Sequence, residues 1–301
     1  MRFLALSALV LLSSWPLESA PAAEVRCASG IYGRYSLPQD EGWFRRRWPS
    51  GVRPTGSTCS SGFIFGPIKP GDYEKVRALY RQNHPFLASF ILASSGGDVV
   101  EAIKIGQLFR RYLIRASAPI RITFPEGGET FTSISHEREC ESGRCICASA
   151  CALMWFGAVD RGGSVGLHRP RTDDPYFRAL GPTEGANAYR GALDSIRQYL
   201  DEMEVPKSMI EAMVATGSAD IKWVDADDGL SRPPSLAEWE DATCGSFSIK
   251  DENLLSDLRA KHSNFAQREQ NLRDQLQNRQ SQWTQCRIEL LSSNRDKLSA
   301  P

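Results

Sequence analysis

The sequence lacks an excess of charge of either sign, and beyond its first residues it lacks a long apolar run. It has 36 Lys or Arg against 36 Asp or Glu among 301 residues, so no basic face for nucleic acid is indicated. No later segment approaches the ~20 apolar residues that a membrane-spanning helix needs. The rest is ordinary globular material, 41% hydrophobic and 24% charged, enough for one sizeable core and a smaller part.

The first 22 residues have the pattern of a secretory signal peptide. Arg2 precedes an apolar core over residues 3–12, and an Ala-Pro-Ala site at residues 20–22 has small side chains where cleavage requires them. We therefore expect an exported chain, secreted or periplasmic, without a membrane span.

Eight cysteines follow this leader, and an oxidising compartment makes disulfides their expected state. They are Cys27, Cys59, Cys140, Cys145, Cys147, Cys151, Cys244 and Cys286. Their distribution suggests local closures among the four between residues 140 and 151, and links from 27 to 59 and from 244 to 286. Zinc is the competing interpretation of the 140–151 cluster. Its spacing does not form a matched pair of zinc knuckles, so neither a metal nor a cofactor is expected.

One serine has the surroundings of a nucleophile. Ser149 lies between Ala148 and Ala150, at the start of an apolar run over residues 150–156 that predicts a buried helix. Unpaired amides at a helix N-terminus stabilise a developing oxyanion. His168 ends a short predicted strand downstream, and histidine is the usual base that activates a serine hydroxyl.

A double glycine precedes this serine in the chain. Residues 86–93 predict a buried strand, Gly96 and Gly97 follow it, and Asp98 begins a predicted helix with an apolar stripe. Strand, turn and helix together indicate an α/β crossover unit. Glycines at such a turn allow close approach to a ligand backbone, as a peptide-docking ledge at Gly96 or an oxyanion donor at Gly97 requires. A tight turn without function has the same pattern.

The acid that would orient the histidine is less sharply marked. Asp220 lies in a polar loop that enters a short predicted strand, and we expect it beside the imidazole. Asp225, Asp227 and Asp228 are rivals, and Asp220 in a purely structural turn is the plain alternative.

The flanking parts differ in composition from the centre. Residues 23–60 predict an irregular N-terminal extension, and residues 61–235 predict the catalytic domain. Residues 250–301 predict an amphipathic helix or weak coiled coil, separate from the catalytic unit, with an imperfect heptad from Leu255 to Leu290. Such a helix needs a partner surface. Self-association is the first expectation, and packing on its own domain through a Cys244–Cys286 bridge is the second.

Three motifs in this order resemble the Clp protease proteolytic subunit of the ClpP/crotonase superfamily, especially exported bacterial relatives. They are Ser-Ser-Gly-Gly at 94–97, Cys-Ala-Ser-Ala-Cys at 147–151 and Gly-Leu-His-Arg-Pro at 166–170, within a resemblance that spans about residues 60–232. The resemblance implies an α/β fold of stacked β-β-α units and homo-oligomers. It implies Ser149 as nucleophile, His168 as general base and Asp220 as orienting acid, with the amides of Gly97 and Ala150 as oxyanion donors.

Two classes of function follow from these patterns. The first is an exported serine peptidase of peptides or unfolded protein, acting without an ATP-driven unfoldase because the exported compartment lacks ATP. The second is an inactive protein of the same fold that binds or assembles. An acyl-CoA enzyme is disfavoured because CoA is not expected outside the cytoplasm. A serine–lysine peptidase is disfavoured because no lysine lies between Lys104 and Lys207.

Overall fold

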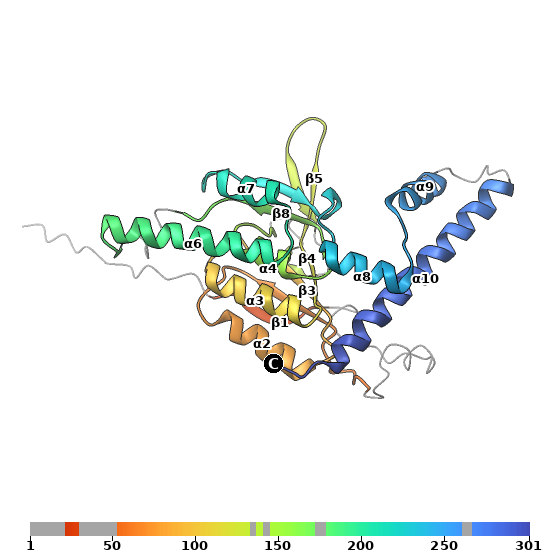
Figure 1. Cartoon of the computed structure of the whole chain (residues 1–301), viewed down its shortest axis with the longest axis horizontal. Coiled ribbons are helices and arrows are strands. Elements are labelled where there is room, and N and C mark those ends of the chain that lie inside the picture. Colours follow the sequence, from red (N-terminus) through yellow and green to blue (C-terminus); the bar gives the residue numbers. More distant parts are fainter. Residues whose placement is uncertain (1–21, 30–52, 133–136, 141–144, 172–178, 261–266) are drawn as a thin grey trace, which may run out of the picture.

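A five-stranded sheet forms the centre of the molecule in the computed structural model, which describes residues 22–29, 53–132, 137–140, 145–171, 179–260 and 267–301 (Figure 1). The strand order is β1-β2-β3-β4-β7, with β1 antiparallel to β2 and the other neighbours parallel. The strands of this sheet are β1 (Glu24–Cys27), β2 (Ser61–Phe65), β3 (Ser89–Ala93), β4 (Arg115–Ser117) and β7 (Arg161–Gly162). A parallel-strand α/β architecture, the expected class, is therefore observed.

Helices make the crossovers that parallel neighbours require. Helix α2 (Asp72–Asn83) joins β2 to β3, and α3 (Val99–Arg111) joins β3 to β4. The helix expected after the double glycine begins as predicted, because the Asp98 side chain accepts a hydrogen bond from the Glu101 amide at 2.9 Å. Because of these crossovers, the carboxyl ends of the parallel strands lie at the same end of the sheet, and Gly96 and Gly97 follow β3 there.

Two smaller sheets and several further helices surround this centre. The hairpin is β5 (Ile120–Thr123) with β6 (Glu129–Thr132), and the second pair is β8 (Ser164–Leu167) with β9 (Lys222–Asp225). The helices are α4 (Ala150–Gly157), α6 (Pro182–Glu202), α7 (Lys207–Ala215), α8 (Pro234–Cys244), α9 (Ile249–Ala260) and α10 (Gln267–Lys297), with short 3-10 turns at Arg138–Cys140 and Ala226–Asp228.

The N-terminal extension is not wholly separate from the domain. Strand β1 pairs along β2, Ala23 is buried, and a Cys27–Cys59 disulfide ties both ends of the segment to the sheet. Four residues with two charged side chains give almost no periodic signal, so this pairing was not predicted. The proposed leader over residues 1–21 and residues 30–52 lie outside the described part of the chain. Among the described residues, no helix is long and apolar enough to cross a membrane.

The described residues of the C-terminal segment form two helices, α9 and α10, where the heptad predicts one. Helices α9 and α10 pack together, and their apolar positions bury a small core with Phe247; its buried helical members are Leu255, Leu258 and Leu276. The heptad residues therefore find partners within the same chain. A Cys244–Cys286 disulfide joins α8 to α10, as the second of the two expectations required.

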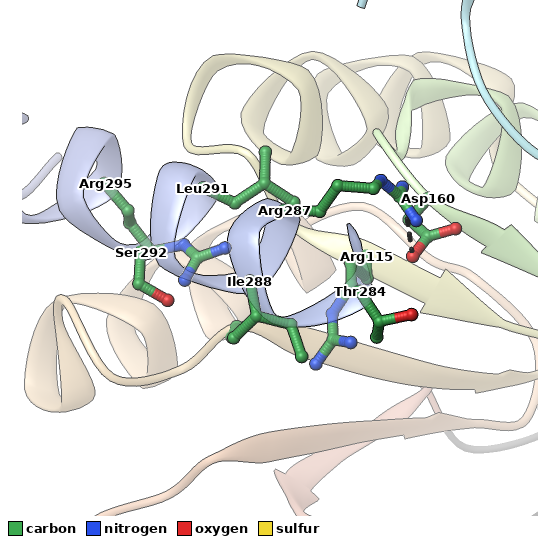
Figure 2. Close-up of a pocket in the computed structure, with 9 residues that line it drawn as sticks. Arg115, Asp160, Thr284, Arg287, Ile288, Leu291, Ser292 and Arg295 are labelled. Carbon is green, nitrogen blue, oxygen red and sulfur yellow. Dashed lines mark ion pairs between the residues drawn. The ribbon is translucent and has the colours of Figure 1, made fainter. Parts of the chain in front are cut away.

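The last turns of α10 lie against the sheet domain (Figure 2). Arg295 is 3% exposed, and its guanidinium donates to the carbonyls of Tyr112 at 3.1 Å and Leu113 at 2.5 Å. Arg287 Nη2 lies 3.9 Å from Asp160 Oδ2. A cavity of about 70 Å³ remains between the helix and the domain. The helix is thus docked on its own domain, not separate from it.

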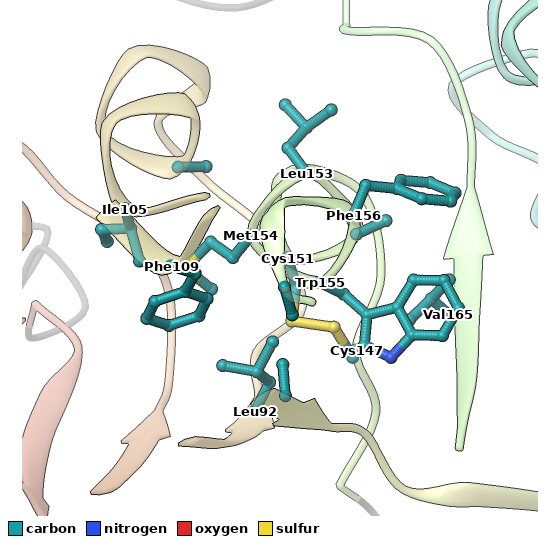
Figure 3. Close-up of a cluster of buried hydrophobic side chains, with 14 of the residues drawn as sticks. Leu92, Ile105, Phe109, Cys147, Cys151, Leu153, Met154, Trp155, Phe156 and Val165 are labelled. Atoms are coloured by element: carbon teal, nitrogen blue, oxygen red, sulfur yellow. A yellow bond between two sulfur atoms is a disulfide. The ribbon is translucent and has the colours of Figure 1, made fainter. Parts of the chain in front are cut away.

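Helix α4 occupies the centre of the apolar core. All eight of its residues are buried, in contact with Phe109, Leu92 and Val165 from neighbouring elements (Figure 3). It approaches α3 closely, because a Cβ on Gly157 would lie 2.2 Å from the carbonyl oxygen of Gly106. A helix that is apolar all round is held rigidly, and this one begins immediately after Ser149.

Candidate active site

Ser149 occupies a sharp turn. Before it, Cys147 and Ala148 form isolated β-bridges with Ser94 and Gly166, and after it α4 begins. Ala148 donates its amide to the Ser94 carbonyl at 3.0 Å, and Ser149 donates its own to the Gly166 carbonyl at 2.9 Å. The backbone of Ser149 has φ 59° and ψ −126°, a sparsely populated region that costs about 1–3 kcal/mol. Neighbouring hydrogen bonds therefore hold the serine in a conformation it would not adopt alone.

Gly96 lies directly against this serine. Its φ is +107°, and a Cβ at this position would lie 2.6 Å from the Ser149 Cβ and 3.0 Å from its Oγ. Any side chain here would displace the hydroxyl. A glycine is therefore required here for the Ser149 side chain to keep its position, a contact that the sequence did not indicate.

Two backbone amides near Ser149 are available as donors. Ile68 bonds to the residues on either side of Gly97, at 2.8 Å to the Gly96 carbonyl and 2.9 Å from the Asp98 amide, so the Gly97 amide faces away from Ile68. Ala150 is the first residue of α4. Within the described chain neither the Gly97 nor the Ala150 amide donates to a backbone carbonyl. Both can serve a developing oxyanion.

His168 follows the end of β8 and is half-buried. Its Nδ1 lies 2.8 Å from the carbonyl oxygen of Arg169. Because a carbonyl only accepts, this contact assigns the proton to Nδ1 and leaves the lone pair on Nε2. The Arg169 amide in turn donates to the Thr216 carbonyl at 3.1 Å, which fixes the backbone that orients the ring.

Ser149 and His168 line one cleft of about 750 Å³. Its walls are the 67–70 loop, the first turn of α3, the inner face of α6 and the Pro170 segment; the apolar members include Ile68, Val99, Val100, Ile103, Ala188 and Ala192. The structure therefore brings together Ser149, His168, Gly96 and Gly97, which are distant in sequence. The contribution of α6 was not predicted, because small alanines on a helix give no chemical signal.

Glu101 holds the 67–72 wall of the cleft to α3. Its carboxylate accepts from the amides of Gly71 at 3.0 Å and Tyr73 at 2.9 Å, and from Lys104 at 3.0 Å. Burial alone would raise the pKa of this carboxyl, but these donors outweigh it and the pKa is lowered. Glu101 is therefore ionised near neutral pH and fixes the rim of the cleft.

Asp220 is not joined to the imidazole in the described structure. It is exposed, and its amide donates to the Gly217 carbonyl at 3.0 Å within its own turn. The rival Asp225 accepts from Ser164 at the opposite end of β8, and Asp228 receives the Asp225 amide. The group in contact with Nδ1 is the Arg169 carbonyl, a backbone atom that no sequence pattern marks.

All eight cysteines are paired, and the pairs agree with the expected distribution. The bridges are Cys27–Cys59, Cys140–Cys145, Cys147–Cys151 and Cys244–Cys286. No thiolate is left for the competing zinc interpretation. Among the residues that the structure describes, no three His, Cys, Asp or Glu side chains gather as a metal site needs.

Comparisons with known proteins add little to this geometry. No family model and no curated protein sequence matches the chain. Among solved structures, a ClpP1 mutant from Listeria monocytogenes is similar at 13% identity, over 57% of this chain and 88% of that chain, with a TM-score of 0.37. A likeness of this extent carries no argument about catalysis, so the site depends on its own geometry.

Proposed function

We propose that this protein is a serine peptidase with a ClpP-like fold, in which Ser149 is the nucleophile and His168 the general base. The observation that carries the proposal is the strained turn at Ser149, which places its hydroxyl beside Gly96 in the cleft that His168 also lines. Strained backbone at a cleft is a common feature of functional sites. The resemblance of the three sequence motifs supports the same roles.

The proposed reaction uses these groups in two steps. Ser149 Oγ forms a bond to the substrate carbonyl carbon while its proton passes to His168 Nε2, and the amides of Gly97 and Ala150 stabilise the oxyanion. The C–N bond then breaks, and the amine leaves with the proton from His168. Water attacks the acyl-serine, with His168 again accepting a proton, and Ser149 regains its hydrogen as the acid product leaves.

The proposed orienting group for the imidazole is the Arg169 carbonyl. It lies 2.8 Å from Nδ1, whereas Asp220 bonds within its own turn. A carbonyl fixes the tautomer as an aspartate would, but it stabilises the imidazolium less because it bears no full charge. The role of Asp220 that the sequence resemblance implies stays a prediction that mutation can test.

We further propose export, to the periplasm or the medium, and action without an ATP-driven unfoldase. Four disulfides support an oxidising compartment. The cleft, with its Gly96 ledge and apolar wall, supports an extended peptide or unfolded protein as substrate. Assembly into homo-oligomers stays a prediction of the resemblance.

A fluorophosphonate probe tests the proposal, because it phosphonylates only an activated serine, with fluoride leaving. Wild type is expected to react, and Ser149→Ala is expected to lose the label and to lower kcat for peptide hydrolysis on the order of 10⁶-fold. Ser95→Ala is the matched control, since Ser95 is exposed in the same cleft and should label as wild type does. Absence of labelling in folded wild type would favour the alternative, an inactive binding or assembly protein.

A further inference from the structure

A disulfide encloses the candidate nucleophile within a five-residue ring. Cys147 and Cys151 are four positions apart with Ser149 midway between them, and their Cα atoms are 5.3 Å apart. Both half-cystines are fully buried in the core, beside Leu92 and Trp155 (Figure 3). The bridge is therefore an internal part of the site and not a surface staple.

The two half-cystines belong to different elements. Cys147 forms an isolated parallel β-bridge with Ser94, which follows the end of β3, and the Cys147 carbonyl accepts from the Gly166 amide at 2.8 Å. Cys151 is the second residue of α4. The disulfide thus links the segment beside the end of β3 to α4, across the turn that holds Ser149 at positive φ.

Backbone hydrogen bonds tie the first residues of this turn to the strand segments beside it. The Ala148 and Ser149 amides bond to Ser94 and Gly166, whereas the Ala150 amide has no backbone acceptor in the described chain. On the helix side, the Cys151 and Ala152 amides donate to the Ala148 and Ser149 carbonyls at 3.1 and 2.9 Å, and the bond between the two sulfurs adds a covalent link from α4 to Cys147. If this covalent closure opens, the turn between Cys147 and Cys151 can relax from the strained conformation of Ser149, and the Ser149 Oγ and the Ala150 amide then lose their alignment with Gly96.

We propose that the Cys147–Cys151 disulfide positions Ser149 and the Ala150 amide for attack, so that catalysis requires this bridge in its oxidised form. This inference depends on the proposed peptidase function. A misplacement of about 1 Å in a reacting group lowers rate by about 100-fold. The bridge is a positioning element, because neither sulfur touches substrate in the proposed reaction.

The neighbouring Cys140–Cys145 bridge supplies a matched control. It closes a loop of nearly the same length, because Cys140 and Cys145 are five positions apart and their Cα atoms lie 5.0 Å apart. Its half-cystines pack in a different cluster, with Phe63 and Ile91. Loss of either bridge removes a similar loop-closure constraint from the unfolded chain, but only one of the two encloses Ser149.

The double variants Cys147→Ala/Cys151→Ala and Cys140→Ala/Cys145→Ala are compared for kcat, KM, melting temperature and the rate of Ser149 phosphonylation. The first is expected to lower kcat and phosphonylation about 100-fold with KM within about twofold, because substrate docking on Gly96 persists. The second should keep kcat within about twofold of wild type. Equal kcat in the two folded variants would overturn the proposal.

Titration of wild type with dithiothreitol gives a readout that does not need a folded variant. Mass spectrometry after alkylation follows each bridge, and phosphonylation should fall in step with opening of 147–151 and recover on reoxidation. Phosphonylation that persists with 147–151 open would overturn the proposal. Wild type that is oxidised and folded yet never labels would instead refute the peptidase function, so the two failures are distinguishable.

Discussion

The cleft and the C-terminal arm, defined as α8 to α10, are held by different kinds of contact. The cleft is built around α4, whose side chains are all buried in one continuous apolar core. The arm has a small core and a disulfide of its own, and guanidinium groups of α10 contact the domain. Close apolar packing restricts the movement of α4, as the proposed reaction at Ser149 requires.

The arm and the sheet domain also differ in how their buried charged side chains are paired. Within the arm, the fully buried Glu240 accepts from Arg232 at 3.0 Å and from Arg287 at 2.7 Å. In the sheet domain, Arg161 of β7 is buried and donates to backbone carbonyls such as those of Ala158 and Leu230; burial lowers its pKa to about 9. Changes in the arm should therefore alter stability and not chemistry, and changes at the cleft should do the reverse.

The largest contrast is expected from His168→Ala. The imidazole is half-buried and its hydrogen bond is to the next residue, so the melting temperature should change little, whereas kcat should fall about 10²- to 10⁴-fold with loss of the base. Peptide hydrolysis and thermal unfolding are measured on the same preparation. A variant that unfolds while its folded fraction turns over normally would show that His168 is a packing residue.

Glu240→Gln should produce the opposite result. Removing the charge leaves two guanidinium groups around a buried neutral amide, and breaking a buried pair costs about 3–5 kcal/mol of unfolding free energy. Glu74→Gln is the control, because its pair with Arg77 is exposed and contributes about 1 kcal/mol or less. Denaturant unfolding gives the difference, and phosphonylation per folded molecule should equal that of wild type. A loss of phosphonylation in the folded fraction would show that the arm supports the cleft.

A smaller effect is expected from acid on the docked end of α10. Burial lowers the pKa of His84, and the charge of Arg295 acts in the same direction. Neutral His84 therefore favours the folded state: its contribution is complete above the unfolded pKa of about 6.5 and is lost as pH falls through the lower folded value. The melting temperature should drop more between pH 7.5 and 5.5 in wild type than in His84→Phe. An equal drop would place the acid sensitivity elsewhere.

Local chemistry explains which parts of this architecture the sequence predicted. Residues 86–93 and 150–156 are apolar enough to predict a buried strand and a buried helix, and the glycines at 96 and 97 occur where positive φ is required. The sequence also predicted where a helix begins, because Asp98 was expected at the start of α3. Each of these signals lies within a few residues of the structure that it predicts.

The sequence did not predict the features that form between distant parts of the chain. Strand β1 exists because it pairs with β2 across an interval of about 35 residues, and the arm docks because Arg295 reaches Tyr112. The heptad of the arm predicted a helical segment, but periodicity cannot say whether an apolar face meets its own chain; self-association, which the resemblance also implied, stays a prediction. The orienting carbonyl of Arg169 had no signal, since every residue has one.

The smallest effect is expected from Asp220→Asn, and it addresses the point where sequence and geometry differ most. If Asp220 orients His168 as the sequence resemblance implies, the amide should impose the wrong tautomer and lower kcat about 10⁴-fold. If the Arg169 carbonyl orients the ring, the exposed Asp220 acts only within its turn, and kcat should fall less than about tenfold. We expect the second result, because the contact at Nδ1 is already occupied at 2.8 Å. Peptide hydrolysis by Asp220→Asn beside Asp225→Asn measures it, with His168→Ala as the reference for loss of the base. A fall near that of His168→Ala in Asp220→Asn alone would show that the carboxylate joins the imidazole when substrate binds.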